Sequence, residues 1–169
     1  MNSKTSLARR VIKKCIARGF TVSTAESCTG GLVSKNLTDV AGCSAAFLGA
    51  CVTYTNEMKQ QLLGVDPAIF AADTEVSHAC AKAMADGARR VFGTTLAVST
   101  TGYAGPTGGT AENPVGTVFL ALSTPTGTFS ERFVAPEDAG RVQVRNAAAW
   151  RSIELLENYL DSEITVEKS

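Results

Sequence analysis

Helix-forming and strand-forming segments alternate along this chain, and no other feature limits its fold as strongly. Residues 7–18 carry apolar side chains along one helical stripe, whereas residues 20–24 alternate and are rich in β-prone side chains. Further helices are expected over 32–39, 56–63, 74–92 and 139–160, and further strands over 47–55, 95–100, 116–123 and 128–135. This order predicts an α/β fold in which helices cover both faces of a sheet.

The last two expected strands are separated by Pro125-Thr126-Gly127, a short segment typical of a hairpin. A hairpin joins antiparallel strands, so we expect a mixed, mostly parallel sheet. The length of 169 residues and the 44% share of hydrophobic residues suit one compact domain. We therefore predict a single domain over residues 1–160, followed by a polar tail over 161–169.

The chain carries 16 basic and 16 acidic residues and has no net charge. This balance argues against nucleic acid as a partner, because nucleic-acid-binding domains are usually strongly basic. Five basic residues share the polar face of the helix over 7–18, namely Arg9, Arg10, Lys13, Lys14 and Arg18. A patch for nucleic acid is one interpretation of this face, and a solvated helix surface is the simpler one.

No stretch of the sequence approaches the roughly 20 apolar residues that a bilayer-spanning helix needs. The N-terminus also lacks the apolar segment of a signal peptide, so we expect a cytoplasmic protein without membrane contact. The five cysteines are widely spaced and include no Cys-x-x-Cys, which favours reduced thiols over disulfides. His78 is the only histidine, so we expect no zinc site and no other metal.

The first segment that suggests chemistry is Glu26-Ser27-Cys28-Thr29-Gly30-Gly31, at an expected strand-to-helix junction. A hydroxyl there would lie on a sharp turn at the end of the sheet. The free N–H groups of the following helix could hold an oxyanion, and the two glycines would let a ligand approach the backbone. The alternative is an ordinary turn in which Ser27 or Thr29 caps the helix.

The second such segment is the loop from Gly102 to Gly109, which follows an expected strand. Ligands of open α/β sheets usually bind beyond the carboxyl ends of the strands. Four glycines in eight residues give a backbone that a ligand can approach, although neither a Walker A motif nor Gly-x-Gly-x-x-Gly is present. A plain surface loop is the alternative, but long connections without secondary structure are more often functional.

Two residues are candidates for the base that would activate Ser27. His78 would complete a Ser-His-Asp triad, but it lies in an apolar-rich segment at an expected helix start. Lys59 falls in the first turn of its expected helix if Thr55 or Asn56 is the N-cap. The helix dipole and burial would both lower the pKa of a lysine there, towards the range in which a neutral amine accepts a proton. A solvated lysine neutralised by Glu57 is the alternative.

Three segments in order resemble the CinA C-terminal domain family. They are Ala25-Glu26-Ser27-Cys28-Thr29-Gly30-Gly31, the stretch Val-Thr-Tyr-Thr-Asn-Glu-Met-Lys at 52–59 with Leu62-Leu63-Gly64-Val65, and residues 101–110 with Pro114-Val115-Gly116-Thr117-Val118. The resemblance covers about residues 5–160. The sequence departs from common family patterns at His78, at Thr107 and in the segment 139–141, which lacks an aspartate.

The resemblance implies a three-layer α/β/α domain, often dimeric, that hydrolyses the carboxamide of nicotinamide mononucleotide in pyridine nucleotide salvage. The products would be nicotinate mononucleotide and ammonia, and no cofactor would be needed. The family's nucleophile maps onto Ser27 and its lysine base onto Lys59, while Tyr54 and Asn56 match the motif in supporting positions. We expect the substrate to contact Cys28, Thr29, Gly30, Gly31, Thr101, Gly102, Gly105, Gly108, Gly109 and Thr110.

Three alternatives remain open at the level of sequence. A nucleotide-binding or regulatory module would keep the glycine-rich loop and use Ser27 only as a cap. A hydrolase of the same mechanism could act on another amide or ester. Cys28 is a rival nucleophile, because a thiol at a helix N-terminus can have a lowered pKa.

Overall fold

The computed structural model describes the backbone of residues 3–166 and the side chains of residues 6–162. Its centre is one five-stranded sheet in the order β2-β1-β3-β4-β5. The strands are β1 (Val22–Glu26), β2 (Phe47–Val52), β3 (Leu96–Gly102), β4 (Thr117–Thr124) and β5 (Gly127–Val134). β1 pairs in parallel with both β2 and β3, whereas β4 is antiparallel to β3 and to β5. The sheet is therefore mixed, as predicted, and only β4 runs against the others.

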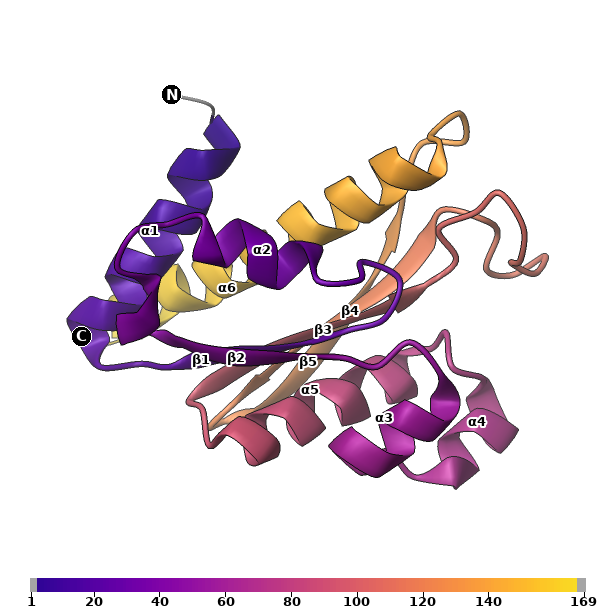
Figure 1. Cartoon of the computed structure of the whole chain (residues 1–169), viewed down its shortest axis with the longest axis horizontal. Coiled ribbons are helices and arrows are strands. Elements are labelled where there is room, and N and C mark those ends of the chain that lie inside the picture. The colour runs from indigo at the N-terminus through magenta and orange to yellow at the C-terminus, as the bar shows by residue number, and fades with distance from the viewer. Residues whose placement is uncertain (1–2, 167–169) are drawn as a thin grey trace.

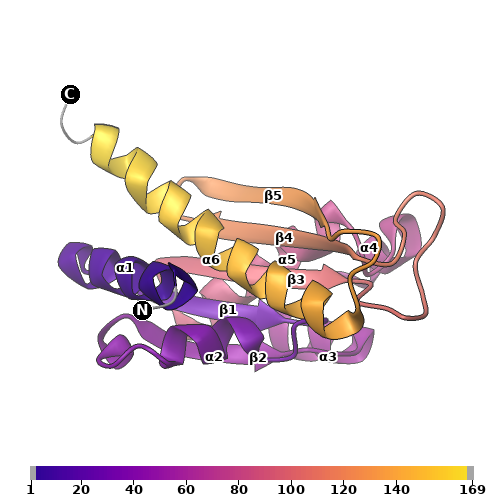
Figure 2. The same ribbon diagram turned by 90° about the horizontal axis from the view of Figure 1, so that it is seen from above.

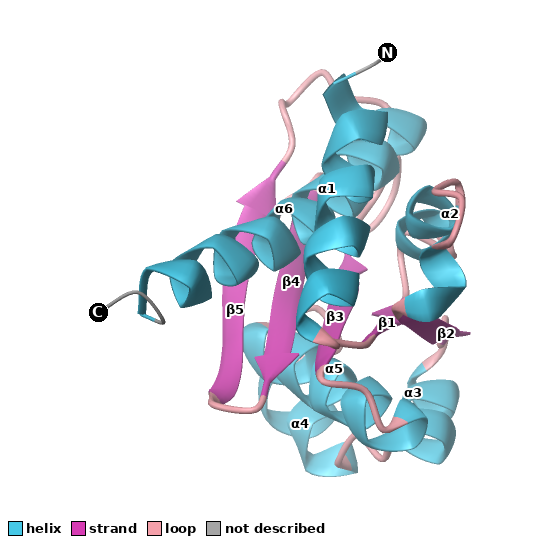
Figure 3. Cartoon of the chain, turned by 90° about the vertical axis from the view of Figure 1, so that its left-hand side faces the viewer, coloured by secondary structure: helices cyan, strands magenta, loops and turns pink. Residues whose placement is uncertain are grey.

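Helices cover both faces of the sheet and complete three layers (Figure 1). One layer holds α1 (Ser3–Arg18), α2 (Leu32–Thr38) and α6 (Arg141–Val166), with α6 lying diagonally over the sheet (Figure 2). The opposite layer holds α3 (Asn56–Leu63), α4 (Pro67–Asp73) and α5 (His78–Phe92) (Figure 3). A short 3-10 turn, Cys43–Ala45, precedes β2. The predicted α/β fold is confirmed.

The hydrophobic core is divided by the sheet into two main parts. On one side, α1, α2 and α6 pack Val11, Leu37 and Ile153 against the sheet. On the other side, α5 packs Met84 and Ala88 against β1 and β3. Every residue of β1 and β4 is buried, because layers on both faces cover these inner strands.

Several expected boundaries differ from the structure. The strand expected over 47–55 ends at Val52 because Thr55 caps α3. The helix expected over 74–92 begins at His78, where the Ser77 hydroxyl accepts from the Cys80 N–H. The short helix α4 was not predicted, and α6 continues to Val166, into the expected polar tail.

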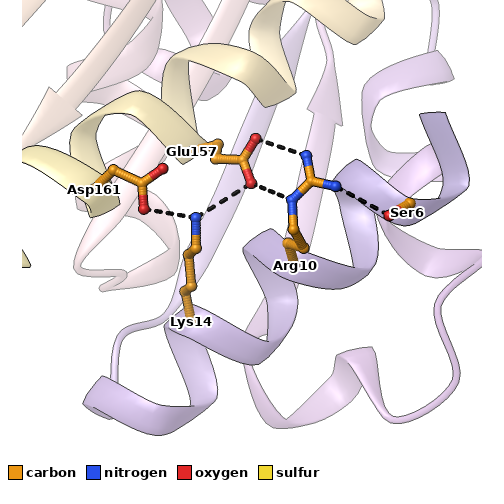
Figure 4. Close-up of polar contacts among 5 residues, drawn as sticks. All are labelled: Ser6, Arg10, Lys14, Glu157 and Asp161. Carbon is orange, nitrogen blue, oxygen red and sulfur yellow. Dashed lines mark hydrogen bonds and ion pairs between the residues drawn. The ribbon is translucent and has the colours of Figure 1, made fainter. Parts of the chain in front are cut away.

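The basic face of α1 is only partly solvated, whereas the sequence favoured a fully solvated helix surface. Arg10 donates from Nε and Nη2 to the two oxygens of Glu157, at 2.6 and 2.9 Å, and Lys14 donates to Glu157 and Asp161 of α6 (Figure 4). Exposed pairs of this kind add little stability, but they align α1 beside α6. Because acidic partners occupy two of its cations, this face is a poor patch for nucleic acid.

No helix within the described part of the chain combines the length and apolar character that crossing a membrane requires.

Candidate active site

The carboxyl ends of β1 and β3 and the segment after β2 meet at one end of the sheet, where a cavity of about 160 Å³ opens. We call it the Ser27 cavity. Its lining residues are Ser27, Cys28, Tyr54, Lys59, Glu75, Val76, Thr101, Gly102, Tyr103, Ala104 and Arg141. They come from five separate parts of the chain, so only the folded structure brings them together.

A tight turn between β1 and α2 places Ser27 in this cavity. The Ser27 N–H donates to the Thr100 carbonyl at 3.0 Å, and the Ser27 carbonyl accepts from the Gly30 N–H at 3.1 Å. Gly30 and Gly31 have φ values of +60° and +97°, in the left-handed region that glycine adopts most readily. At Gly30 a Cβ would also lie 3.0 Å from an Arg145 nitrogen. The two glycines are therefore needed for the turn itself.

Glu26, the last residue of β1, is fully buried and caps α2. Its carboxylate accepts from the N–H groups of Gly31, Val33 and Ser34 at 2.8–3.1 Å, and from the hydroxyls of Thr29 and Ser34. The first N–H groups of α2 are thus already satisfied, so they are not the free oxyanion donors that the sequence suggested.

The donors that remain for an oxyanion lie in the turn itself. Gly30 uses its N–H within the turn, whereas the N–H groups of Cys28 and Thr29 donate to no other residue in the described chain. The Thr29 side chain is fully buried, and its hydroxyl lies 2.7 Å from both Glu26 and Thr100. Thr29 could therefore offer a ligand its backbone but not its hydroxyl.

Lys59 lies in the first turn of α3 and points into the cavity. Thr55 is the N-cap, and its hydroxyl accepts from the Met58 N–H at 3.3 Å. Lys59 is only 1% exposed as a residue, and its Nζ donates to Ser27 Oγ at 3.3 Å. Burial lowers the pKa of the Lys59 ammonium, although negative groups nearby oppose this effect. The structure thus pairs a buried hydroxyl with an amine that loses its proton more easily than a solvated lysine.

Cys28 also lines the cavity, but the residue is only 5% exposed. Burial raises the pKa of this thiol to about 12, so the reactive thiolate is disfavoured. The side chain packs in a core cluster with Ala104 and Val144. These features make Cys28 a packing residue rather than an activated thiol.

His78 lies apart from Ser27. It is the first residue of α5, its Nδ1 lies 2.9 Å from Ser130 Oγ, and its ring meets Phe119 edge-on. It lines a different cavity of about 740 Å³, which we call the outer cavity and which shares Val76 and Tyr103 with the Ser27 cavity. The structure therefore gives no support to a Ser-His-Asp triad.

Only four of the ten expected substrate contacts line either of these two cavities. Cys28, Thr101 and Gly102 line the Ser27 cavity, and Thr110 lines the outer one. The remaining expected contacts line neither cavity: Thr29, Gly30, Gly31, Gly105, Gly108 and Gly109. Of the two supporting positions, Tyr54 lies at the Ser27 cavity, whereas Asn56 is the half-buried first residue of α3 and does not line it.

Two charged residues of the lining, Arg141 and Glu75, were not identified from the sequence. Arg141 donates from Nη1 to the Gly105 carbonyl at 2.7 Å and from Nη2 to the Tyr54 hydroxyl at 2.9 Å. It thereby links α6 to the glycine-rich loop. Arg141 lies in the segment 139–141, which we compared with a common family pattern only for its missing aspartate, so this segment was the signal that could have found it. Glu75 lies in none of the motifs, and only the fold places it at the cavity. No three histidine, cysteine or acidic side chains of the described residues lie close enough together to hold a metal ion.

Comparison with known proteins identifies the family. The model of the CinA C-terminal domain matches residues 4–160. The chain belongs to the CinA C-terminal domain family. Among its relatives, a CinA-like protein of Geobacter sulfurreducens is 50% identical over 142 residues, 82% of this chain and 34% of that protein. One of Myxococcus xanthus is 48% identical over 143 residues, 84% of this chain and 34% of that protein. The chain thus spans about a third of the length of these curated relatives.

Solved structures of CinA proteins have the same fold. The competence/damage inducible protein CihA from Agrobacterium tumefaciens superposes with a TM-score of 0.90 at 40% identity, covering 95% of this chain and 97% of that one. A CinA superfamily protein from Klebsiella pneumoniae superposes with a TM-score of 0.90 at 31% identity, covering 96% of this chain and 99% of that one. The three-layer architecture is therefore that of the CinA family.

Proposed function

We propose that this CinA domain is an amidase that hydrolyses the carboxamide of nicotinamide mononucleotide to nicotinate mononucleotide and ammonia, a reaction of pyridine nucleotide salvage. The observation that supports it best is the contact of 3.3 Å between Lys59 Nζ and Ser27 Oγ at the wall of a cavity. A serine next to a lysine with a lowered pKa is a known arrangement for nucleophilic attack on a carbonyl. The choice of substrate rests on the resemblance of the three motifs to the family.

In the first half of the reaction, neutral Lys59 takes the proton of the Ser27 hydroxyl while Oγ attacks the carboxamide carbon. The N–H groups of Cys28 and Thr29 are the candidates to hold the oxyanion, since neither has another acceptor in the described chain. Lys59 then gives this proton to the departing nitrogen. Ammonia leaves, and the acyl group remains on Ser27 as an ester.

In the second half, Lys59 takes a proton from water, and the hydroxide formed attacks the ester carbon. The bond between the acyl group and Ser27 Oγ breaks, and Lys59 returns the proton to Oγ. The acid is released, and both residues regain their starting protonation states. No step requires a metal or an organic cofactor.

The sizes of the cavities agree with a substrate that occupies both of them. The Ser27 cavity, at about 160 Å³, is smaller than the roughly 300–1,000 Å³ of most small-molecule sites. The outer cavity of about 740 Å³ adjoins it across Val76 and Tyr103. We propose that the carboxamide end of the substrate enters the Ser27 cavity and that the ribose and phosphate extend towards Thr110.

The test is ammonia release from nicotinamide mononucleotide, compared with nicotinamide and NAD, by the unaltered chain and by Ser27→Ala. We expect release from the mononucleotide, and its loss in the variant. Turnover of another amide, without turnover of the mononucleotide, would refute the assignment of this substrate. Calorimetric binding of the mononucleotide without any turnover would refute the enzyme and favour the nucleotide-binding module.

A further inference from the structure

Glu75 is the only carboxylate among the lining residues of the Ser27 cavity. It lies in the short connection between α4 and α5 and is half-buried. Within the described residues, its carboxylate makes no ion pair and accepts no hydrogen bond from a side chain or backbone N–H. Burying a charge without a partner is unfavourable. A carboxylate in this situation, at the wall of a reaction cavity, is complementary to a positively charged ligand.

The backbone around Glu75 is held in an uncommon conformation. Thr74 has φ 65° and ψ 170°, a region that is essentially restricted to glycine. Within the described residues, Thr74 is the only residue other than glycine that has a positive φ. Two hydroxyls stabilise this conformation: Thr101 Oγ1 donates to the Glu75 carbonyl at 2.6 Å, and Ser77 Oγ donates to the Thr74 carbonyl at 3.0 Å. Thr101 also lines the cavity, so the strained connection is tied directly to its wall.

The two cations of the lining are engaged with other groups. Arg141 is bound to the Gly105 carbonyl and to the Tyr54 hydroxyl. Lys59 is directed at Ser27 and must be neutral to act as a base. When Lys59 is in this form, Arg141 is the one remaining cation of the lining, and its hydrogen bonds go to the neutral carbonyl and hydroxyl and not to Glu75.

We propose that Glu75 is a specificity-determining residue that selects carboxamides attached to a positively charged ring. This inference rests on the proposed function and assigns to Glu75 the recognition of one feature of its substrate, the positive charge of an N-substituted pyridinium ring. In such a ring the charged nitrogen lies two bonds from the carbon that bears the carboxamide. A carboxamide at Ser27 therefore brings the charge into the small cavity that Glu75 lines. A neutral ring of the same shape gains no such interaction.

The same charge affects Lys59. Burial lowers the pKa of Lys59 most strongly, and the negative charges of Glu75 and of Glu57 of α3 oppose this effect. The thiols of Cys80 of α5 and Cys28 of the turn also lie near Lys59. Arg141 of α6 is the other charged group at this cavity. A bound pyridinium neutralises Glu75 and so favours the neutral amine that the reaction needs. Ring charge would thus aid both binding and activation of the base.

The experiment measures binding by calorimetry in the Ser27→Ala background, which removes turnover. The ligands are nicotinamide mononucleotide, whose ring is cationic, and its reduced dihydropyridine form, whose ring is neutral. Glu75→Gln keeps the shape and removes the charge. We expect Glu75→Gln to weaken binding of the cationic ligand about tenfold, equivalent to about 1.4 kcal/mol. Binding of the neutral ligand should weaken less than about twofold. Glu57→Gln is the matched control, because Glu57 also raises the pKa of Lys59 but lies outside the cavity, and it should change neither affinity.

The inference would be overturned if Glu75→Gln lowered the affinity for both ligands equally, or lowered the affinity for neither. A second measurement uses the unaltered Ser27: the rate of ammonia release in Glu75→Gln should reach its plateau at lower pH, because the pKa of Lys59 loses a group that raises it. If the unaltered chain releases no ammonia, the proposed function fails, whereas the two affinities still decide the role of Glu75. Failure of both ligands to bind would overturn both.

Discussion

Replacing Glu26 with glutamine should destabilise the protein strongly, although only one oxygen is exchanged for nitrogen. One carboxylate oxygen accepts from the Ser34 N–H, and the other accepts from the N–H groups of Gly31 and Val33. Whichever oxygen becomes an NH₂ group, at least one backbone N–H then faces a donor. This N–H is left without an acceptor at a site where Glu26 is fully buried.

The magnitude follows from these contacts. A buried N–H without an acceptor costs about 1–3 kcal/mol, and loss of the negative charge at the start of α2 adds roughly 0.3–1 kcal/mol. The free energy of unfolding should therefore fall by roughly 1.3–4 kcal/mol. For a domain of this size, such a loss lowers the Tm by about 3–15 °C.

Thermal unfolding followed by circular dichroism or calorimetry measures this change. Glu57→Gln is a suitable control, because Glu57 also lies in the first turn of a helix but is exposed. This variant loses the charge at the helix start without leaving a buried N–H unpaired, so its Tm should fall by no more than about 4 °C. Amide hydrogen exchange at Gly31, Val33 and Ser34 should become faster in Glu26→Gln. A Tm within about 2 °C of the unaltered chain would refute the argument that these N–H groups depend on the carboxylate.

Three further predictions concern the reaction. Ser27→Ala should lower kcat by several orders of magnitude and leave folding intact; more than about a tenth of the original rate, a change of only about 1.4 kcal/mol, would exclude Ser27 as nucleophile. Lys59→Met should lower kcat at least about 100-fold, and it should raise the Tm at neutral pH because burial disfavours the ammonium. In the unaltered chain, the rate should rise with pH up to the lowered pKa of Lys59 and then level off. A rate that does not change with pH would contradict the lysine base. Cys28→Ala should keep its activity within about tenfold, since burial raises the pKa of the thiol to about 12; an acyl group trapped on Cys28 would overturn this assignment.

Features encoded by neighbouring residues could be predicted from the sequence. The bounds of α3 were correct because a capping residue, Thr55, and a terminating glycine, Gly64, lie directly at its ends. The placement of Lys59 in the first turn followed from the same local signal. The helix α4 was missed because it has only seven residues and no residue of it is fully buried, so it shows no strong apolar stripe.

Features that depend on distant residues could not be predicted in this way. Glu26 looked like part of a catalytic motif, but its role is to cap α2 from inside the core, and nothing in its neighbours shows that its carboxylate is buried. Glu75 reaches the cavity from the connection between α4 and α5, and Arg141 reaches it from the first residue of α6 in the opposite layer. Their positions depend on how α5 and α6 pack on the sheet, which no local pattern contains.

The contact between Arg145 and the Ser27 turn has a consequence for biosynthesis. Arg145, on α6, donates from Nε to the Cys28 carbonyl and from Nη2 to the Thr29 carbonyl, both at 2.9 Å, across 117 and 116 residues of chain. The ribosome therefore makes Ser27 and Lys59 before it makes the side chain that secures the turn. A nascent chain that has not reached α6 contains Ser27 and Lys59 but cannot complete these two contacts. The final geometry of the turn thus forms only after α6 has been made and packs on the sheet.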